Sequence, residues 1–182
     1  MRLFIAINCD DATKTLLLSV QEKIKAQSAK GSFSRPENLH LTLAFIGETP
    51  EEQIPAICSV IENALQSPLA PFALAFSRTG CFRHSNKELW WAGADRADPF
   101  LGILKNIRQR ITDGLSAKGI AFDKRSFNPH ITLGREIKYE TPIVIPEQNI
   151  IFPVSRISLM KSERINGTLV YTEIFGQDLS SV

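Results

Sequence analysis

The chain has 182 residues, of which 43% are hydrophobic and 22% are charged, and its formal net charge is +2. This composition is that of an ordinary globular protein, and it excludes collagen-like, low-complexity and intrinsically disordered chains. No apolar stretch approaches the roughly 20 residues that a transmembrane helix requires. The apolar stretch at the N-terminus is too short for a secretory signal. We therefore expect a cytoplasmic protein without a membrane partner.

The cysteines and histidines, three of each, do not have the spacing of metal ligands. Cys9, Cys58 and Cys81 form no C-x-x-C pair, and they fit a reducing compartment in which free cysteines fill the core. The histidines form no H-x-H or H-E-x-x-H motif. We expect neither a metal nor another cofactor.

The first half of the chain alternates between strand and helix patterns. The expected elements are a strand over residues 3–7, a helix over about 12–30, a turn at 35–38, a strand over 39–46 and a helix over about 49–66. Asp10 or Asp11 caps the first helix, and Gly31 ends it.

The second half repeats part of this order. The expected elements are strands over 72–76 and 88–92 with a polar loop through His84, Ser85 and Asn86 between them, a helix over about 98–118, and strands over 130–134, 154–161 and 169–175, the last two joined by a turn at 165–167. Short links between strands predict an α+β fold with largely antiparallel sheets. A strand, a long helix and a strand that begins with H-x-T occur near 3–46 and again over 88–134, which indicates a weak internal repeat.

Two tetrapeptides share one pattern: His40-Leu41-Thr42-Leu43 and His130-Ile131-Thr132-Leu133. On a strand, His and Thr two residues apart share one face, and the apolar residues between them point into the core. A single such pair is usually a packing feature, because Thr is common in strands. Two copies that contain two of the three histidines indicate a site.

Two imidazoles and two hydroxyls facing one cleft suit phosphodiester chemistry. With an ordinary pKa of about 6.5, one imidazole can be neutral and take a proton from water while the other is protonated and gives one to a departing alkoxide. The threonine hydroxyls can donate hydrogen bonds to the phosphate oxygens. This chemistry requires no metal and no nucleophilic side chain. The motifs alone do not say which histidine is the acid.

These motifs and their surroundings resemble the 2H phosphoesterases, in particular the bacterial RNA 2′,3′-cyclic phosphodiesterases, historically called 2′-5′ RNA ligases. The similar segments are PENLHLTLAFIG at 36–47, NPHITLGR at 128–135, and ISLMKSE at 157–163 followed by Gly167 and Tyr171. The resemblance extends from the first strand to about Phe175. It implies one bilobal domain over 1–182, with two pseudo-symmetric lobes of mostly antiparallel sheet, outer helices and an active-site cleft between the lobes.

The same resemblance implies a reaction and its residues. A terminal 2′,3′-cyclic phosphate of RNA would be hydrolysed to a 2′-phosphate, with reversible 2′-5′ joining of RNA ends as the related reaction. His40 would be the proton donor to the leaving O3′, and His130 would be the proton acceptor that activates water. Thr42 and Thr132 would hold the phosphate. We expect a monomer, because the cleft uses both lobes of one chain.

Four further residues are candidates for substrate contacts. The resemblance makes Arg135 a phosphate contact, but strict strand alternation places it on the back face unless Gly134 bends the strand. A surface ion pair is the alternative for Arg135. Phe45, Phe127 and Trp91 are candidates for stacking on a base, with core packing as the alternative for each.

Residues 105–138 carry an excess of positive charge, with eight Lys and Arg against three acids. Such an excess can attract phosphate, or it can be a solvated helix face.

Two other functions are compatible with the sequence. The same site could act on 2′-5′ linked oligonucleotides or on small cyclic nucleotides, since specificity depends on loops. A non-catalytic RNA-binding module is the alternative from a different class, but binding alone gives no reason for two titratable His-Thr pairs.

Overall fold

The computed structural model describes residues 1–66, 69–84 and 87–180. Its elements are β1 (Arg2–Asn8), α1 (Asp11–Lys25), β2 (Lys30–Phe33), β3 (His40–Glu48), α2 (Ile54–Ala64), β4 (Phe72–Phe76), β5 (Arg78–His84), β6 (Lys87–Gly93), α3 (Leu101–Ala117), β7 (His130–Lys138), β8 (Ile150–Val154), β9 (Arg156–Ile165) and β10 (Thr168–Asp178). The strands of this described part pair in antiparallel fashion. The predicted α+β class is confirmed.

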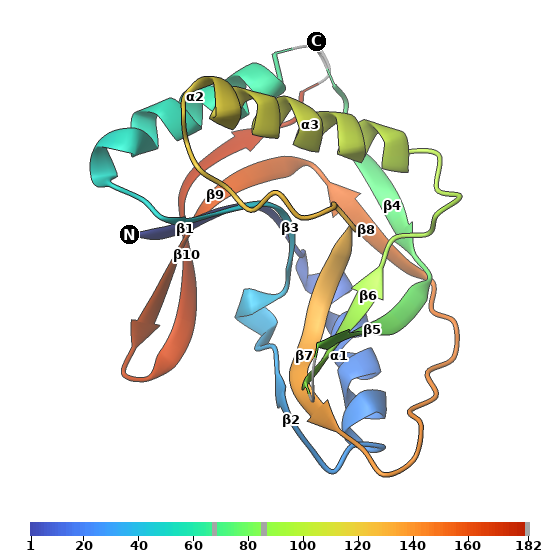
Figure 1. Ribbon diagram of the computed structural model, residues 1–182. Coiled ribbons are helices and arrows are strands. Elements are labelled where there is room, and N and C mark those ends of the chain that lie inside the picture. The colour runs from blue at the N-terminus through green and yellow to red at the C-terminus, as the bar shows by residue number, and fades with distance from the viewer. Residues whose placement is uncertain (67–68, 85–86, 181–182) are drawn as a thin grey trace.

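One large sheet contains both H-x-T strands at its centre. Its strand order is β10-β9-β1-β3-β7-β6-β5, with β2 beside β7, while β4 and β8 form a separate two-stranded sheet. Strands β3 and β7 pair only where Leu41 lies opposite Ile131, so the sheet divides into two lobes at this point (Figure 1). Because these two residues follow His40 and His130, the junction brings both histidines together.

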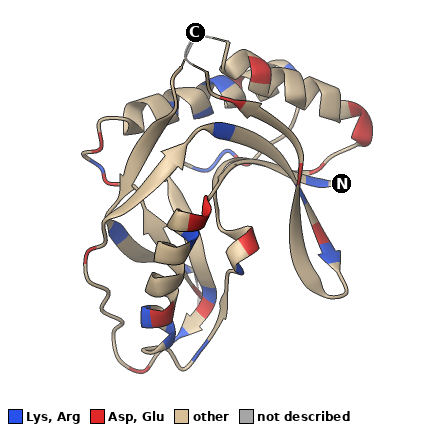
Figure 2. Cartoon of the chain, turned by 180° about the vertical axis from the view of Figure 1, so that it is seen from behind, with Lys and Arg blue, Asp and Glu red and all other residues tan. Residues whose placement is uncertain are grey.

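The helices cover the sides of the sheet away from the cleft, and each lobe is covered by a helix from the other half of the chain. Helix α1 packs against β7, β2 and β8, whereas α3 packs against β3 and α2 (Figure 1). Seen from behind, both signs of charge are scattered over these helices (Figure 2). None of the helices in the described part is long and apolar enough to cross a membrane.

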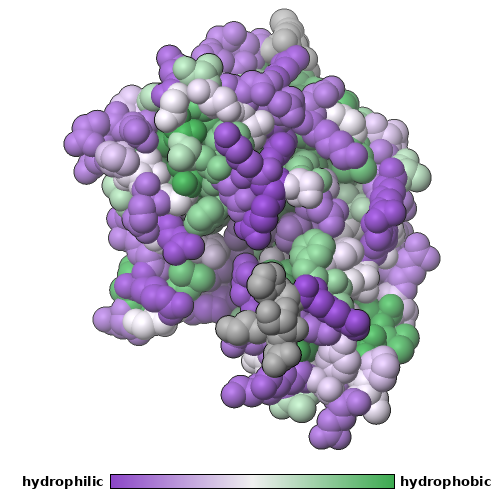
Figure 3. Space-filling view, in the orientation of Figure 1, coloured by the Kyte–Doolittle hydropathy of each residue, from purple (hydrophilic) through white to green (hydrophobic). Residues whose placement is uncertain are grey.

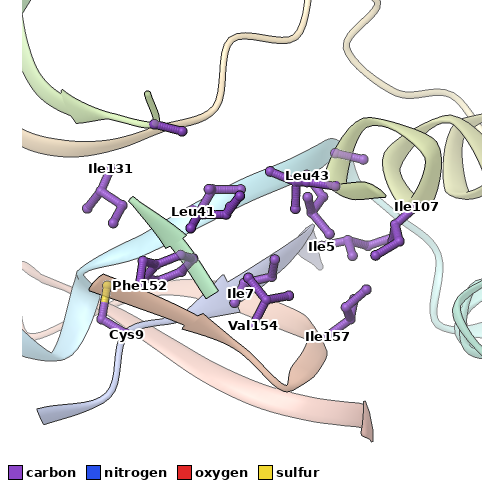
Figure 4. Packing of buried hydrophobic residues seen from close by; sticks show 14 of the residues in the cluster. Ile5, Ile7, Cys9, Leu41, Leu43, Ile107, Ile131, Phe152, Val154 and Ile157 are labelled. Atoms are coloured by element: carbon purple, nitrogen blue, oxygen red, sulfur yellow. The ribbon is translucent and has the colours of Figure 1, made fainter. Parts of the chain in front are cut away.

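The core fills the space between these helices and the back of the sheet. Figure 4 shows Ile5 and Ile7 of β1 with Leu41 of β3, and Ile107 of α3 at the right of the view. Each of these four side chains is at most 3% exposed. Cys9 belongs to this cluster, and burial raises the pKa of its thiol to about 12. The cysteine is therefore a core residue with little thiolate at neutral pH.

The first helix and its continuation differ from the prediction. Asp10 caps α1 by accepting a hydrogen bond from the backbone N–H of Thr13 at 2.9 Å, as predicted. The helix ends at Lys25 rather than near Gly31, because the following backbone pairs with β7: Ala29 N–H donates to the Lys138 carbonyl at 2.8 Å. Long-range pairing overrides helix propensity here.

Two strands were also absent from the prediction. Residues 78–84, expected as part of the polar loop, form β5 along β6, while residues 85 and 86 of that loop lie outside the described part. Strand β8 pairs with β4 although it contains Pro153, which an edge strand tolerates. The second helix is shorter than predicted, because α2 starts at Ile54 after a 3₁₀ turn. The predicted turn between β9 and β10 is confirmed, with positive φ at Asn166 and Gly167.

The β3–β7 junction predicts a specific effect on stability. Leu41 is fully buried, so Leu41→Ala should lower the free energy of unfolding by about 2–5 kcal/mol. Leu16 is 43% exposed on α1, so Leu16→Ala should change it by less than about 0.5 kcal/mol. Urea denaturation of the two variants measures both values, and equal effects would contradict this assignment of the core.

Candidate active site

A β-bulge in β7 determines which side chains face the cleft. Thr132 lies opposite Trp91 of β6. Because the two strands are antiparallel, the following pair is formed by the preceding residue of β6, Trp90, which lies opposite Gly134 rather than opposite Leu133. Leu133 is therefore the extra residue, and it and Gly134 both lie on the buried side of the strand.

The bulge reverses the alternation for the rest of the strand. Arg135 pairs with Leu89 and returns to the face that carries Thr132. Strict alternation would have placed Arg135 on the back face. The strand is thus irregular next to Gly134, as the position of Arg135 required, but the cause is the extra residue Leu133 and not a bend at the glycine.

Strand β3 contains the same bulge at the same place in its motif. Thr42 lies opposite Ala6, Ala44 lies opposite Ile5, and Leu43 is the extra residue. Phe45 consequently faces the cleft from β3, as Arg135 does from β7. The internal repeat therefore includes six positions: His, an apolar residue, Thr, Leu, a small residue (Ala or Gly) and a sixth residue that faces the cleft. The sixth residue is Phe45 in one lobe and Arg135 in the other.

Both imidazoles are held in the same orientation by the backbone two residues earlier. The Nδ1 atom of His40 lies 2.7 Å from the Asn38 carbonyl oxygen, and that of His130 lies 2.6 Å from the Asn128 carbonyl oxygen. A carbonyl only accepts, so each Nδ1 carries the hydrogen. In the neutral form the Nε2 atom of each ring therefore carries the lone pair and is the atom that can accept a proton.

Aromatic rings pack against each histidine in a matching way. The ring of His40 lies 4.8 Å from Phe4 and 5.2 Å from Tyr171, measured between ring centroids. The ring of His130 lies 5.1 Å from Phe82. Thr42 Oγ1 lies 3.0 Å from His40 Nε2, within hydrogen-bond distance. The rings restrict how far each imidazole can rotate.

Three adjoining cavities meet at the two motifs. The central cavity, of about 720 Å³, is lined by His40, Thr42, His130, Thr132 and Arg135. The His40-side cavity, of about 370 Å³, includes His40 and Tyr171, and the His130-side cavity, of about 580 Å³, includes His130 and Phe127. Figure 3 shows this face hollowed between the β9–β10 hairpin and β7, with mostly hydrophilic side chains around the hollow.

Positive charge outweighs negative charge at the central cavity, whose lining also includes Glu48 and Glu163, the latter paired with Lys161 at 2.6 Å. Arg135 lines all three cavities, and within the described residues no carboxylate forms an ion pair with it. Arg2, with its guanidinium 5.0 Å from the Phe45 ring centroid, and Lys161 and Arg164 lie along the rim. The unpaired guanidinium of Arg135 is therefore available to an anion between the histidines.

The remaining stacking candidates differ in their positions. Phe127 lines the His130-side cavity, and Phe45 lines the central one. Trp91 is only 7% exposed, and its indole packs over Gly80 and against the ring of Phe82. The structure thus places Trp91 behind His130 rather than in a cavity wall.

Sequence reasoning missed several residues that line the cavities. Phe4 lies on β1 beside β3, Tyr171 and Phe82 lie on the outer strands β10 and β5, and Arg108 reaches the His130-side cavity from α3. Phe4 belonged to a strand expected to be wholly buried, so no local pattern distinguished it. The equivalent position of the other half is Leu89, since Phe4 lies opposite Phe45 and Leu89 lies opposite Arg135, so the repeat gives no signal for Phe4 either.

Both histidines have lowered pKa values. Burial lowers the pKa of His40 from 6.5 to about 4; the hydrogen bond to the Asn38 carbonyl opposes this, and the positive charge of Arg135 adds to it. Burial also lowers the pKa of the more open His130. In the free protein both rings are therefore mainly neutral at pH 7.

The sequence is similar to known proteins over most of its length. It matches the family described as LigT-like phosphoesterase over residues 7–91 and 97–171. The chain belongs to this family. A LigT-like relative, the RNA 2′,3′-cyclic phosphodiesterase of Thermus thermophilus, is 31% identical over 176 residues, which cover 94% of this chain and 87% of that protein.

Solved LigT-like structures have the same fold. The structure of Escherichia coli LigT complexed with 3′-AMP has a TM-score of 0.83 at 27% identity and covers 99% of this chain and 98% of that one. The structure of TT0787 of Thermus thermophilus has a TM-score of 0.79 at 30% identity, covering 100% and 99% of the two chains. These similarities confirm the predicted 2H phosphoesterase resemblance.

Titration of the histidines tests the electrostatics of this site. Both pKa values should lie below 6.5, with that of His40 the lower, because burial disfavours the charged ring. The unfolded chain then binds more protons between pH 4 and 6.5, so stability should rise with pH across this window. NMR spectra of the ring C–H groups give the pKa values directly. A pKa above 6.5 for either ring in the ligand-free protein would contradict the assignment.

Proposed function

We propose that this chain hydrolyses the terminal 2′,3′-cyclic phosphate of RNA to a 2′-phosphate, without a metal. The observation that carries the proposal is the convergence of two His-Thr pairs and one unpaired arginine on a single cavity. Relatives that the chain matches over most of their length are named RNA 2′,3′-cyclic phosphodiesterase, which supports the choice of substrate. Because both motifs come from one chain, we further propose that the monomer is active.

The phosphate binds between the lobes in this proposal. Thr42 and Thr132 donate hydrogen bonds to its non-bridging oxygens from opposite sides, and the Arg135 guanidinium balances its charge. These donors are fixed on strands rather than on loops, so they need little rearrangement as charge develops on the oxygens.

The two histidines then transfer protons on opposite sides of phosphorus. Neutral His130 takes a proton from water at Nε2 as the water oxygen forms its bond to phosphorus. Protonated His40 gives its Nε2 proton to O3′ as the P–O3′ bond breaks. The product is a 2′-phosphate with a free 3′-hydroxyl, and the protonation states of the two rings are exchanged.

Substrate binding supplies the protonated state of His40. In the free protein the ring is neutral at pH 7, because burial lowers its pKa. A phosphodiester anion placed next to the ring favours the imidazolium and raises that pKa. His40 therefore becomes protonated when the substrate binds.

The same arrangement can accept another nucleophile. A 5′-hydroxyl of RNA in the position of water would yield a 2′-5′ phosphodiester, and the reverse reaction would cleave such a linkage.

The direct test uses an oligoribonucleotide that ends in a 2′,3′-cyclic phosphate, incubated with the protein in excess EDTA. The wild-type chain should produce the 2′-phosphate only. His40→Ala and His130→Ala should each lower kcat/KM at least about a hundredfold, because each removes one proton-transfer group.

Lys105→Ala is the control, since Lys105 is exposed on α3 away from the motifs and its loss should leave the rate within twofold. Thermal unfolding of the variants separates loss of chemistry from loss of fold. A 3′-phosphate product, inactivity in EDTA, or a histidine variant of near-normal rate would each contradict the proposal.

A further inference from the structure

The His130-side cavity is far larger than a water molecule needs. Its volume is about 580 Å³, and a water occupies about 30 Å³ in the liquid. It opens directly onto His130, Thr132 and Arg135 of the candidate active site. Two aromatic rings also line it, Phe82 on β5 and Phe127 in the loop before β7. Phe82 is 38% exposed although it is a large apolar residue, and its edge contacts the His130 ring.

Besides Arg135 of the motif strand, the cavity contains a second arginine, Arg108, with no ion pair among the described residues. The guanidinium of Arg108 lies 5.4 Å from the Phe127 ring centroid, and its Nε atom is buried without a hydrogen-bond partner. Arg125, in the same wall, is paired with Asp123, its Nε lying 2.7 Å from the carboxylate. Asp123 is the only carboxylate among the described residues that line the cavity. Two guanidinium groups therefore remain for ligands, that of Arg135 at the motifs and that of Arg108 farther along the cavity wall.

This combination of groups matches a nucleotide residue. Exposed aromatic rings stack on bases with little sequence preference. A guanidinium without an ion pair binds a phosphate oxygen, and that of Arg108 lines the cavity beside the Phe127 ring.

The geometry of the reaction decides which nucleotide this is. Attack and departure occur in line, on opposite faces of phosphorus, and His130 is on the attacking side in the function proposed above. The His130-side cavity includes His130 but not His40, whereas the His40-side cavity includes His40 but not His130. The nucleoside that carries the cyclic phosphate remains attached through O2′ on the departing side. The His130-side cavity therefore lies where the nucleophile enters.

We propose that the His130-side cavity is the binding site of an RNA strand whose 5′-hydroxyl replaces water as nucleophile. Phe82 and Phe127 contact its first bases, and Arg108 binds the first internucleotide phosphate. The 5′-oxygen forms a bond to phosphorus and gives its proton to His130 as the P–O3′ bond breaks and O3′ takes the proton of His40. One 2′-5′ phosphodiester forms, one cyclic phosphodiester bond is lost, and no water is consumed. This inference rests on the function proposed above.

The experiment measures the partition between transfer and hydrolysis. Wild-type protein is given 2′,3′-cyclic AMP as donor and a ribodinucleotide with a free 5′-hydroxyl as acceptor at millimolar concentration, and products are separated by chromatography. Transfer product should increase with acceptor concentration and saturate. Arg108→Gln should lower the ratio of transfer to hydrolysis at least fivefold, while hydrolysis of 2′,3′-cyclic AMP alone stays within twofold of wild type.

Arg110→Gln is the matched control. It removes the same charge from the same helix, but Arg110 faces α2, where its side chain bonds to the Ala64 carbonyl. The partition ratio of this variant should equal that of wild type.

Three outcomes would overturn the inference. Transfer could be absent while wild-type hydrolysis is normal, or the partition could be unchanged in Arg108→Gln. Alternatively, Arg108→Gln could lower hydrolysis of 2′,3′-cyclic AMP as strongly as transfer, which would place the donor nucleoside in this cavity. Failure of wild-type hydrolysis itself would instead overturn the function on which the inference rests.

Discussion

The site depends on one buried contact, that of Leu41 against Ile131 where β3 meets β7. Both residues are fully buried, and on a strand the neighbours of a buried residue point to the opposite face. His40 and His130 are those neighbours, so the pairing that joins the two lobes also places both imidazoles at one cavity. The distance between the histidines is therefore set by core packing. A change in this contact would separate the two histidines that we propose share a phosphate.

The two halves of the internal repeat have equivalent strands, but the side chains around the two motifs differ. The same bulge follows each motif threonine, yet it presents Phe45 in one lobe and Arg135 in the other. His40 is also more deeply buried than His130, which lowers its pKa further. Acid–base catalysis needs two groups whose environments differ, because one must hold a proton while the other accepts one. In the free protein His40 is thus the harder of the two rings to protonate, so its proposed role as proton donor depends on the bound phosphate anion, which raises its pKa.

The sequence predicted the fold class, the order of most elements and the two motif pairs, because these follow from periodicity, capping and a repeated pattern. It did not predict β2, β5 or β8, whose residues are extended through pairing with β7, β6 and β4. The bulge at Leu133 was also beyond local reasoning, since it depends on the register between two strands. Arg108 was only one of eight basic residues until the fold placed α3 beside the cleft.

The central claim is that His40 and His130 bind the same phosphate, and a titration measures this directly. Addition of 2′-AMP, the product that the proposed reaction gives from 2′,3′-cyclic AMP, should raise the pKa of both rings, because one anion then lies next to both. NMR signals of His40 and His130 should follow a single binding isotherm with the same Kd. Movement of only one histidine, or two different Kd values, would contradict a shared site.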